Sequence, residues 1–157
     1  MKIELRDVLP ADQDRLFEFW CDPESVRMAA FTHEHQNDRG DFDAHQARLL
    51  RSHDVNQRAI TVDGELVGTI GSFVMEGDTE VTYWIDRAHW GRGVATAALS
   101  LLLAQVPVRP LFAGAASDNV ASLRVLHKAG FVDVGAEVGF ANGRGQEITE
   151  TRLRLDA

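Results

Sequence analysis

The sequence predicts a mixed α/β fold, in which a mostly antiparallel β-sheet carries helices on both of its faces. Three consecutive runs of β-forming residues, 56–62, 65–75 and 79–86, are joined by an Asp-Gly turn and a Glu-Gly-Asp turn, which indicates a meander of antiparallel strands. An uninterrupted apolar helix is expected at 95–104, directly after a pair of glycines. A meander cannot belong to a purely parallel sheet, so we expect a mixed one.

The first third of the chain predicts one strand followed by helices. Residues 2–8 alternate as a half-buried strand does, and residues 10–21 place three large apolar side chains on one helical stripe. A second helix is expected where Asp22 can act as the N-cap and Pro23 can take the first helical position. A third helix is expected at about 42–52.

The last third of the chain predicts one more helix, with one strand before it and two strands after it. They are a strand at 110–116, a helix capped by Ser117 or Asp118 that runs to Lys128 and stops at Gly130, and two strands at 131–140 and 147–155 around a turn at 142–145.

Length and composition limit the classes of protein to consider. A chain of 157 residues with 45% hydrophobic and 25% charged residues has the size and composition of one soluble domain, which we expect to span residues 1–157. The formal net charge of -8 argues against nucleic-acid binding, which needs a cationic surface. There is no run of about 18 apolar residues and no apolar leader segment, so we expect no membrane partner and a cytoplasmic location. The single cysteine, Cys21, is expected to be a packed thiol.

Two glycines stand where the strand at 79–86 passes into the apolar helix. Gly91 and Gly93 allow a sharp turn, after which the backbone amides of residues 92–96 can all point at one anion, and the positive end of the helix dipole adds to them. The expected guest is a pyrophosphate. The alternative is that the two glycines only make a tight connection between strand and helix.

Two common phosphate-binding loops do not fit this segment. A dinucleotide fingerprint would need glycine where Thr96 stands, and the Gly-Lys-Ser or Gly-Lys-Thr of a Walker loop occurs nowhere in the chain. The phosphate-bearing ligand is therefore expected to be neither a nicotinamide cofactor nor ATP.

Two segments of the chain resemble one family. Residues 83–85 with 89–96, and residues 119–131, are similar to the motifs of the GNAT superfamily of acyl-CoA-dependent N-acyltransferases, closest to the branch that acetylates the N-termini of ribosomal proteins. The superfamily usually has Gln or Arg where this chain has Trp90, and that replacement is common in the ribosomal-protein branch. The resemblance implies a GNAT-like fold with acetyl-CoA as co-substrate.

The resemblance also implies where acetyl-CoA lies. Its phosphates are expected over residues 90–96 and its pantetheine arm along residues 83–86. The cofactor-binding residues implied in this way are Trp84, Ile85, Trp90, Gly91, Arg92, Gly93, Val94, Ala95, Thr96, Asn119 and Ser122. Among these, Arg92 has the alternative of a solvated surface arginine, and Asn119 that of an ordinary residue at a helix start.

Acetyl transfer to an amine requires a neutral amine, and Glu80 is the candidate general base. Lysine amines titrate near ~10.4 and α-amines near ~8, so a base helps the first group more than the second. Glu80 begins the strand Glu-Val-Thr-Tyr-Trp-Ile, where the resemblance implies a carboxylate base that acts through one water. The alternative is a glutamate that faces solvent.

The departing thiolate needs a proton, for which Ser122 and Asn119 are the candidates. Many relatives have a tyrosine acid at the position of Leu126, and leucine cannot donate a proton. Ser122 matches a serine that the ribosomal-protein branch places near the sulfur; the alternative is a helix serine bonded to a backbone carbonyl. The oxyanion would be met by a backbone amide near Trp84 or Ile85, provided that this strand splays away from residues 111–115.

The spacing of two histidines is compatible with a metal site, but we do not predict one. His33 and His35 would face the same way on an extended segment, but two ligands without a third do not define a metal site, so none is predicted. The loop that holds them is expected to line the acceptor entrance. His89 and His127 are expected at the surface, whereas Trp20, Tyr83 and Trp84 are expected to pack in the core.

The sequence therefore predicts an acetyl-CoA-dependent N-acetyltransferase that acts by direct attack in a ternary complex. Its acceptor is a primary amine, either of a small molecule or of a peptide, and a homodimer is possible by resemblance. The alternative is a non-catalytic acyl-CoA-binding or regulatory module of the same fold, for which the leucine at position 126 gives some support.

Overall fold

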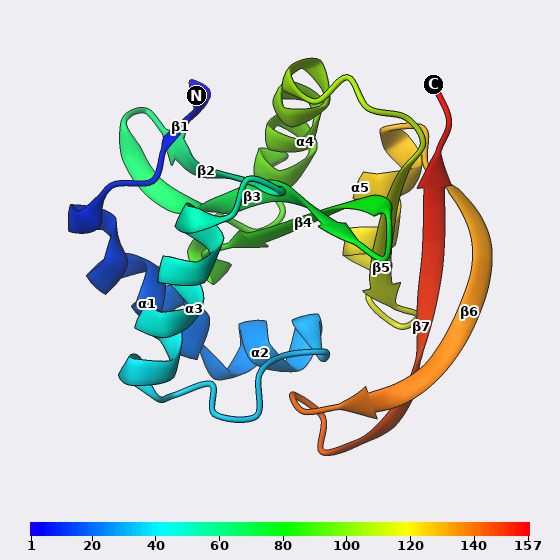
Figure 1. The fold of residues 1–157 in the computed structure, drawn as a ribbon, viewed down its shortest axis with the longest axis horizontal. Helices are drawn as coiled ribbons and strands as arrows, with labels where there is room; N and C mark the ends of the chain where they lie inside the picture. Colours follow the sequence, from blue (N-terminus) through cyan, green and yellow to red (C-terminus); the bar gives the residue numbers. More distant parts are fainter.

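The computed structural model describes residues 1–157, and its elements follow the predicted order (Figure 1). The strands are β1 (Ile3–Asp7), β2 (Val55–Val62), β3 (Glu65–Met75), β4 (Asp78–Ile85), β5 (Leu111–Ala116), β6 (Val132–Ala141) and β7 (Gln146–Leu155). The α-helices are α1 (Gln13–Cys21), α2 (Pro23–Ala29), α3 (Arg39–Arg51), α4 (Val94–Gln105) and α5 (Val120–Lys128). Short 3-10 turns stand at Pro10–Asp12 and Arg87–His89.

The seven strands form one mixed sheet in the order β1-β2-β3-β4-β5-β7-β6. Every neighbouring pair is antiparallel except β4 and β5, which run parallel. This confirms the prediction of a mixed, mostly antiparallel sheet. The parallel pair is in register at only two positions, Thr79 with Leu111 and Glu80 with Phe112. Beyond Glu80 the two strands diverge, so the sheet is open at its centre.

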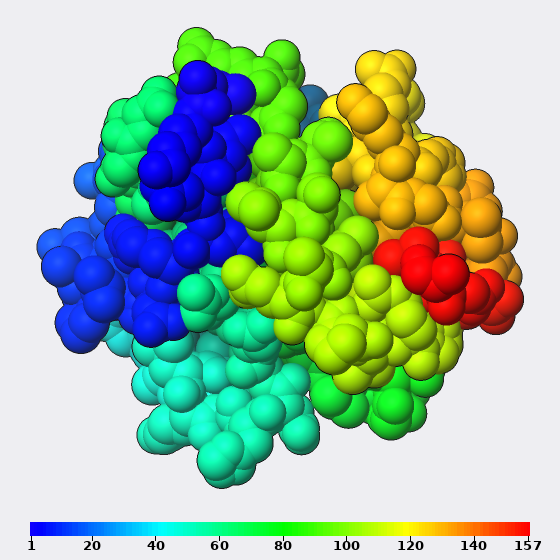
Figure 2. All heavy atoms as spheres, turned by 90° about the horizontal axis from the view of Figure 1, so that it is seen from above, coloured from blue at the N-terminus to red at the C-terminus, as the bar shows by residue number.

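Helices cover both faces of the sheet, as predicted. Figure 1 shows α4 and α5 on one face and α1, α2 and α3 on the other, with the long β6–β7 hairpin at one edge. Seen from above in Figure 2, α4 crosses the middle of its face between the blue N-terminal strand and the yellow α5. The opening between β4 and β5 therefore lies between two helical layers.

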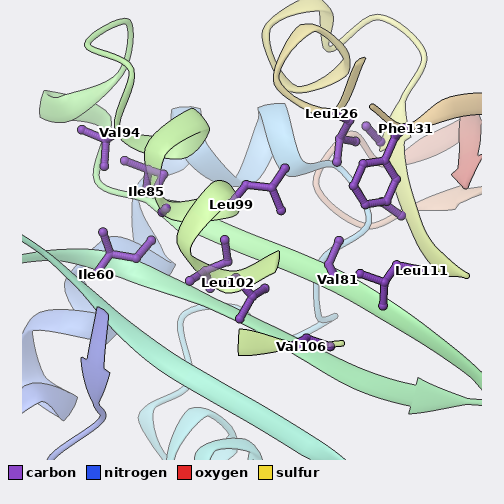
Figure 3. Close-up of a cluster of buried hydrophobic side chains, with 14 of the residues drawn as sticks. Ile60, Val81, Ile85, Val94, Leu99, Leu102, Val106, Leu111, Leu126 and Phe131 are labelled. Carbon is purple, nitrogen blue, oxygen red and sulfur yellow. The ribbon is translucent and has the colours of Figure 1, made fainter. Parts of the chain in front are cut away.

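The main hydrophobic core lies between the sheet and the helices α4 and α5. It comprises 18 buried residues, and Leu99 and Leu102 on α4 are both fully buried in it. Figure 3 shows Leu99 and Leu102 of α4 among the labelled core side chains, with Leu126 and Phe131 on the side of Leu111. A smaller cluster centred on Phe19 and Phe42 joins α1 and α3 to the other face.

Most helix boundaries agree with the sequence, and two were wrong. Asp22 caps α2 by accepting a hydrogen bond from the Ser25 amide, as expected. Helix α3 begins three residues before Phe42, because the Asp38 side chain caps it by accepting from the Asp41 amide. Helix α5 is capped by Asn119 rather than by Ser117 or Asp118. No helix is both long enough and apolar enough to span a bilayer.

Candidate active site

A cavity of about 830 Å³ lies where β4 and β5 diverge. Residues from both strands line it, together with the loop after β4, the first turns of α4 and α5, and side chains of α1, α2 and α3. The cavity therefore reaches through the open centre of the sheet, and both faces of the molecule contribute side chains to it.

The glycine loop has the geometry that the sequence predicted. Gly91 and Gly93 have φ values of +74° and +78°, in the left-handed region that favours glycine. The first backbone bond of α4 runs from the Ala97 amide to the Gly93 carbonyl. None of the amides from Gly91 to Thr96 donates a hydrogen bond to the protein, and no acidic residue occupies the first turn of α4. Six consecutive free amides at a helix N-terminus are the kind of donors that an anion site requires.

Trp90 holds the start of this loop against the end of β4. Its indole Nε1 donates a hydrogen bond to the Ile85 carbonyl oxygen at 2.9 Å, and its side chain is 39% exposed. Arg92 is exposed, makes no ion pair and does not line the cavity, which fits the alternative of a surface arginine. The charge at the loop therefore comes from the backbone and the helix dipole.

The free edge of β4 offers the amides of Tyr83 and Ile85 to the opening. In an antiparallel ladder, alternate residues turn both N–H and C=O toward the same neighbour. The Asp86 amide donates to Val67 on the β3 side, so Trp84 turns toward β3 while Tyr83 and Ile85 turn toward β5. Of the two amides predicted as oxyanion donors, only that of Ile85 faces the opening. Trp84 instead packs its ring beneath the sheet, and its Nε1 donates to the Phe19 carbonyl oxygen.

Glu80 lies at the point where β4 and β5 separate. Its residue is only 7% exposed and lines the cavity, so the alternative of a solvent-facing glutamate is wrong. Arg152 on β7 donates from its guanidinium to Glu80 Oε2 at 2.6 Å, and Oε1 makes no hydrogen bond to the protein. Gly114 on β5 makes this contact possible, because a Cβ there would lie 2.7 Å from both Arg152 and Glu150.

Carboxylates and one cation share this part of the cavity. Arg152 lies within 3.7 Å of Glu150 as well as bonding Glu80, and its hydrogen bond with Glu80 raises the pKa of its guanidinium. Burial raises the pKa of Glu150. The group therefore carries one cation against two carboxylates, which suits the approach of a positively charged amine. The sequence did not indicate Arg152, because it lies 72 residues from Glu80.

Ser122 lies on the first turn of α5, opposite β4, and bonds to the only tyrosine of the chain. Its Oγ is 2.7 Å from the Tyr83 hydroxyl oxygen, and both residues line the cavity. Burial raises the pKa of Tyr83 despite the opposing effect of the Ser122 hydrogen bond, so the phenol stays protonated at neutral pH. We expected Tyr83 only to pack in the core. Tyr83 shares one face of β4 with Val81 and Ile85, because alternate side chains point the same way. This alternation could have shown that the Tyr83 side chain points toward α5.

Asn119 and Leu126 have structural environments on α5. The Asn119 side chain accepts from the Ser122 amide through Oδ1 and donates to the Met28 carbonyl oxygen through Nδ2. Asn119 thus caps α5 and connects it to α2 at the cavity wall. This environment is the one expected under the alternative, in which Asn119 is an ordinary residue at a helix start. Leu126 is 2% exposed and belongs to the main core.

The histidines are arranged differently from the expectation. The His33 ring packs against the rings of His45, at 4.6 Å, and Trp20, which the expectation did not include, and both His33 and His35 are exposed. His33 lines the cavity, as expected for the acceptor side. Burial lowers the pKa of His33 and lowers that of His45 to about 4. His89 is half-buried at the cavity, which corrects its surface assignment, whereas His127 is exposed as expected.

The fold and the free amides at the start of α4 fit a protein that binds a phosphate-bearing ligand, and comparison with known proteins gives the family. Residues 2–132 match the family described as Acetyltransferase (GNAT) domain. The chain belongs to this family.

One curated relative and two solved structures agree with this membership. The "Probable N-acetyltransferase YjcK" of Bacillus subtilis (strain 168) is 31% identical over 96 residues, which cover 55% of this chain and about half (53%) of that protein. The ribosomal-protein-alanine N-acetyltransferase of Brucella melitensis is 18% identical with a TM-score of 0.82 over 100% of both chains. RimJ of Mycobacterium smegmatis, solved with CoA-disulfide, is 21% identical with a TM-score of 0.82 over 99% of this chain and 82% of its own. At these identities the two structures establish the fold.

Proposed function

We propose that this protein transfers the acetyl group of acetyl-CoA to a primary amine by direct attack in a ternary complex. The observation that carries the proposal is the row of six free amides, Gly91 to Thr96, beside the open edge of β4. Bound acetyl-CoA supplies the thioester whose acetyl group is transferred. The loop holds the pyrophosphate, and the Ile85 amide donates a hydrogen bond to the carbonyl oxygen as negative charge develops on it.

The acceptor amine enters from the α1–α3 face and loses one proton there. Glu80 receives that proton at Oε1, through one water, while Arg152 holds Oε2 and fixes the orientation of the carboxylate. The carboxylates around Arg152 attract the ammonium form of the acceptor before it loses the proton. Glu80 and Arg152 thus act on the side of the sheet opposite to α5.

One proton must also reach the sulfur as the carbon–sulfur bond breaks. Ser122 donates its hydroxyl proton to the thiolate, and Tyr83 replaces it through the 2.7 Å hydrogen bond. A tyrosine whose pKa is raised by burial suits this task, because it enters the reaction with its proton in place. The nitrogen loses two protons in becoming an amide: the first leaves the ammonium through Glu80 to solvent, and the second, lost as the amide forms, replaces the proton that Tyr83 gave up. The products are one amide, one thiol and one released proton.

The acceptor itself is proposed only as a primary amine, on a small molecule or at a peptide N-terminus. The ribosomal-protein-alanine N-acetyltransferase with this fold supports a peptide amine. A homodimer stays a prediction, and light scattering on the purified protein checks it.

The test is acetyl-CoA binding by calorimetry together with thiol release over a library of amines. Glu80→Gln should lower kcat by about 100-fold, the size of a general-base contribution, with unchanged acetyl-CoA affinity. Glu147→Gln is the matched control, since Glu147 is exposed on β7 and makes no ion pair. Ser122→Ala should lower kcat as well, with Ser100→Ala on exposed α4 surface as its control. Binding of acetyl-CoA without any amine-dependent thiol release would instead establish the non-catalytic binding module.

A further inference from the structure

The segment at the end of α2 forms a wall of the cavity in a backbone conformation that alanine rarely adopts. Met28, Phe31 and His33 all line the cavity, and we call residues 28–33 the acceptor wall. Within it, Ala30 has a φ of +65° and a ψ of -58°, and the Phe31 amide donates to the Ala29 carbonyl oxygen at 2.7 Å. This is the strained form of a three-residue turn. A strained turn persists only where surrounding contacts hold it, so the acceptor wall depends on its neighbours.

The turn between β6 and β7 supplies these contacts, and Figure 1 shows it next to the end of α2. The Gly143 amide donates to the Ala30 carbonyl oxygen at 2.8 Å, and Asn142 Nδ2 donates to the Thr32 carbonyl oxygen at 2.7 Å. A Cβ at position 143 would lie only 2.3 Å from the Val26 carbonyl oxygen, so glycine is needed for this close approach. The acceptor wall is therefore held by a turn that lies more than 100 residues away in the sequence.

Arg144 in the same turn connects the acceptor wall to the start of α5. Its Nε donates to the Arg27 carbonyl oxygen at 2.6 Å, and its two terminal nitrogens donate to the two carboxylate oxygens of Asp118 at 2.8 and 2.9 Å. The Arg144 side chain is only 11% exposed. A planar guanidinium that meets three fixed oxygens has one orientation, so it sets the distance between the two elements. Neither Arg144 nor Asp118 lines the cavity.

The two connected elements border the cavity from opposite faces of the sheet. The start of α5 carries Ser122, next to Tyr83 of β4, and the end of α2 forms the acceptor wall. We infer that Arg144 is a positioning residue that fixes the acceptor wall relative to the start of α5 and thereby places the amine for attack. This inference rests on the proposed acetyl transfer and adds to it a residue outside the cavity. Transfer between two bound groups depends on their relative placement, and a misplacement of about 1 Å can cost about 100-fold in rate.

The test is Arg144→Met, which keeps the length of the side chain and removes all of its donors. The probe is the amine that the unmodified protein acetylates fastest in a library with pentylamine, cadaverine and Ala-Ala-Ala-NH2. KM for this amine should rise by about tenfold and kcat should fall, because the strained wall relaxes and no longer holds the amine in one place. The Kd for acetyl-CoA in calorimetry should stay within about twofold, since Arg144 makes no hydrogen bond to the free amides before α4. Partial unfolding would lower kcat through the active fraction but leave KM unchanged, so the rise in KM is the decisive readout.

Two further variants separate the pair from general stability. Asp118→Asn keeps one acceptor oxygen and should raise KM for the amine by less than Arg144→Met, while the double variant should be no worse than Arg144→Met alone. Arg6→Met is the matched control, because Arg6 also donates to both oxygens of one carboxylate, Asp12, and to a backbone carbonyl oxygen, that of Asp7. Neither Arg6 nor Asp12 lines the cavity, so KM for the amine should not change in this control.

Different outcomes overturn different claims. An unchanged KM in Arg144→Met and Asp118→Asn, an equal rise in Arg6→Met, a matching rise in the Kd for acetyl-CoA, or a double variant well above Arg144→Met in KM would each refute the positioning role and leave acetyl transfer in place. If Arg144→Met does not fold, KM of Asp118→Asn decides by the same criteria. Absence of thiol release with every amine of the library would refute the transferase and the positioning role together.

Discussion

His45 should make the stability of this protein depend on pH below neutrality. Its ring packs 5.4 Å from that of Trp20 and 4.6 Å from that of His33, and burial lowers its pKa from 6.5 to about 4. Above pH 6.5 the ring is neutral in both the folded and the unfolded chain. Between pH 6.5 and about 4 only the unfolded chain binds the proton, so the free energy of unfolding falls as the pH falls.

The size of this effect follows from the interval between the two pKa values. Each pKa unit corresponds to about 1.4 kcal/mol, so His45 accounts for about 3 kcal/mol at most. Water reaches part of the half-buried ring and screens the charge, and we therefore expect a loss of about 2 kcal/mol. That is a large share of the about 5–15 kcal/mol that holds a domain of this kind folded.

Urea unfolding followed by tryptophan fluorescence measures the effect at pH 7 and at pH 4.5. The matched variant is His45→Phe, which keeps a ring against Trp20 and removes the titration. Carboxylates that also titrate in this interval, such as Glu150, affect both proteins equally and cancel in the comparison. The unmodified protein should lose about 2 kcal/mol more than the variant between the two pH values. Equal losses would show that the buried neutral His45 does not govern the acid response.

Three further substitutions test the site. Gly93→Ala should raise the Kd for acetyl-CoA in calorimetry by about tenfold, because alanine is strained by about 1–2 kcal/mol at a φ of +78°; an unchanged Kd would refute the role of the loop geometry. Tyr83→Phe should lower kcat without changing the Kd for acetyl-CoA, and an unchanged kcat in stopped-flow thiol release would exclude Tyr83 from the proton path. Gly114→Ala should displace the Arg152 guanidinium from Glu80 and lower kcat with little change in melting temperature, whereas full activity would show that this ion pair is not needed.

Local chemistry explains how much of the fold could be predicted. The Asp63-Gly64 turn joins β2 to β3, and Asp63 and Gly64 have φ values of +51° and +85°, which Asp and Gly tolerate. The glycine loop is also local, since Gly91 and Gly93 supply both left-handed positions within three residues. The shape of such turns depends on a few consecutive residues, so the sequence alone could predict it.

The start of α5 shows why other features could not be predicted. Ser117, Asp118 and Asn119 are three consecutive residues that all cap helices well. Asn119 takes the role because its Nδ2 also reaches the Met28 carbonyl oxygen, while Asp118 pairs with Arg144 from the β6–β7 turn. Both partners lie far away in the sequence, so the choice among equal local candidates is made by tertiary contacts.

The same reasoning applies to the donor of the proton to the leaving thiolate. The resemblance directed attention to position 126 on α5, where leucine is buried in the core and can donate nothing. The phenol that α5 lacks at that position is present on the opposite wall of the opening, where Tyr83 of β4 bonds to Ser122 of α5. An opening between two diverging strands can receive a side chain from either wall, so the loss of a group from one helix does not remove its chemistry from the cavity. The alternation of side chains along β4 predicts the face on which Tyr83 lies. Only the divergence of β4 from β5 shows that this face borders a cavity as well as the core.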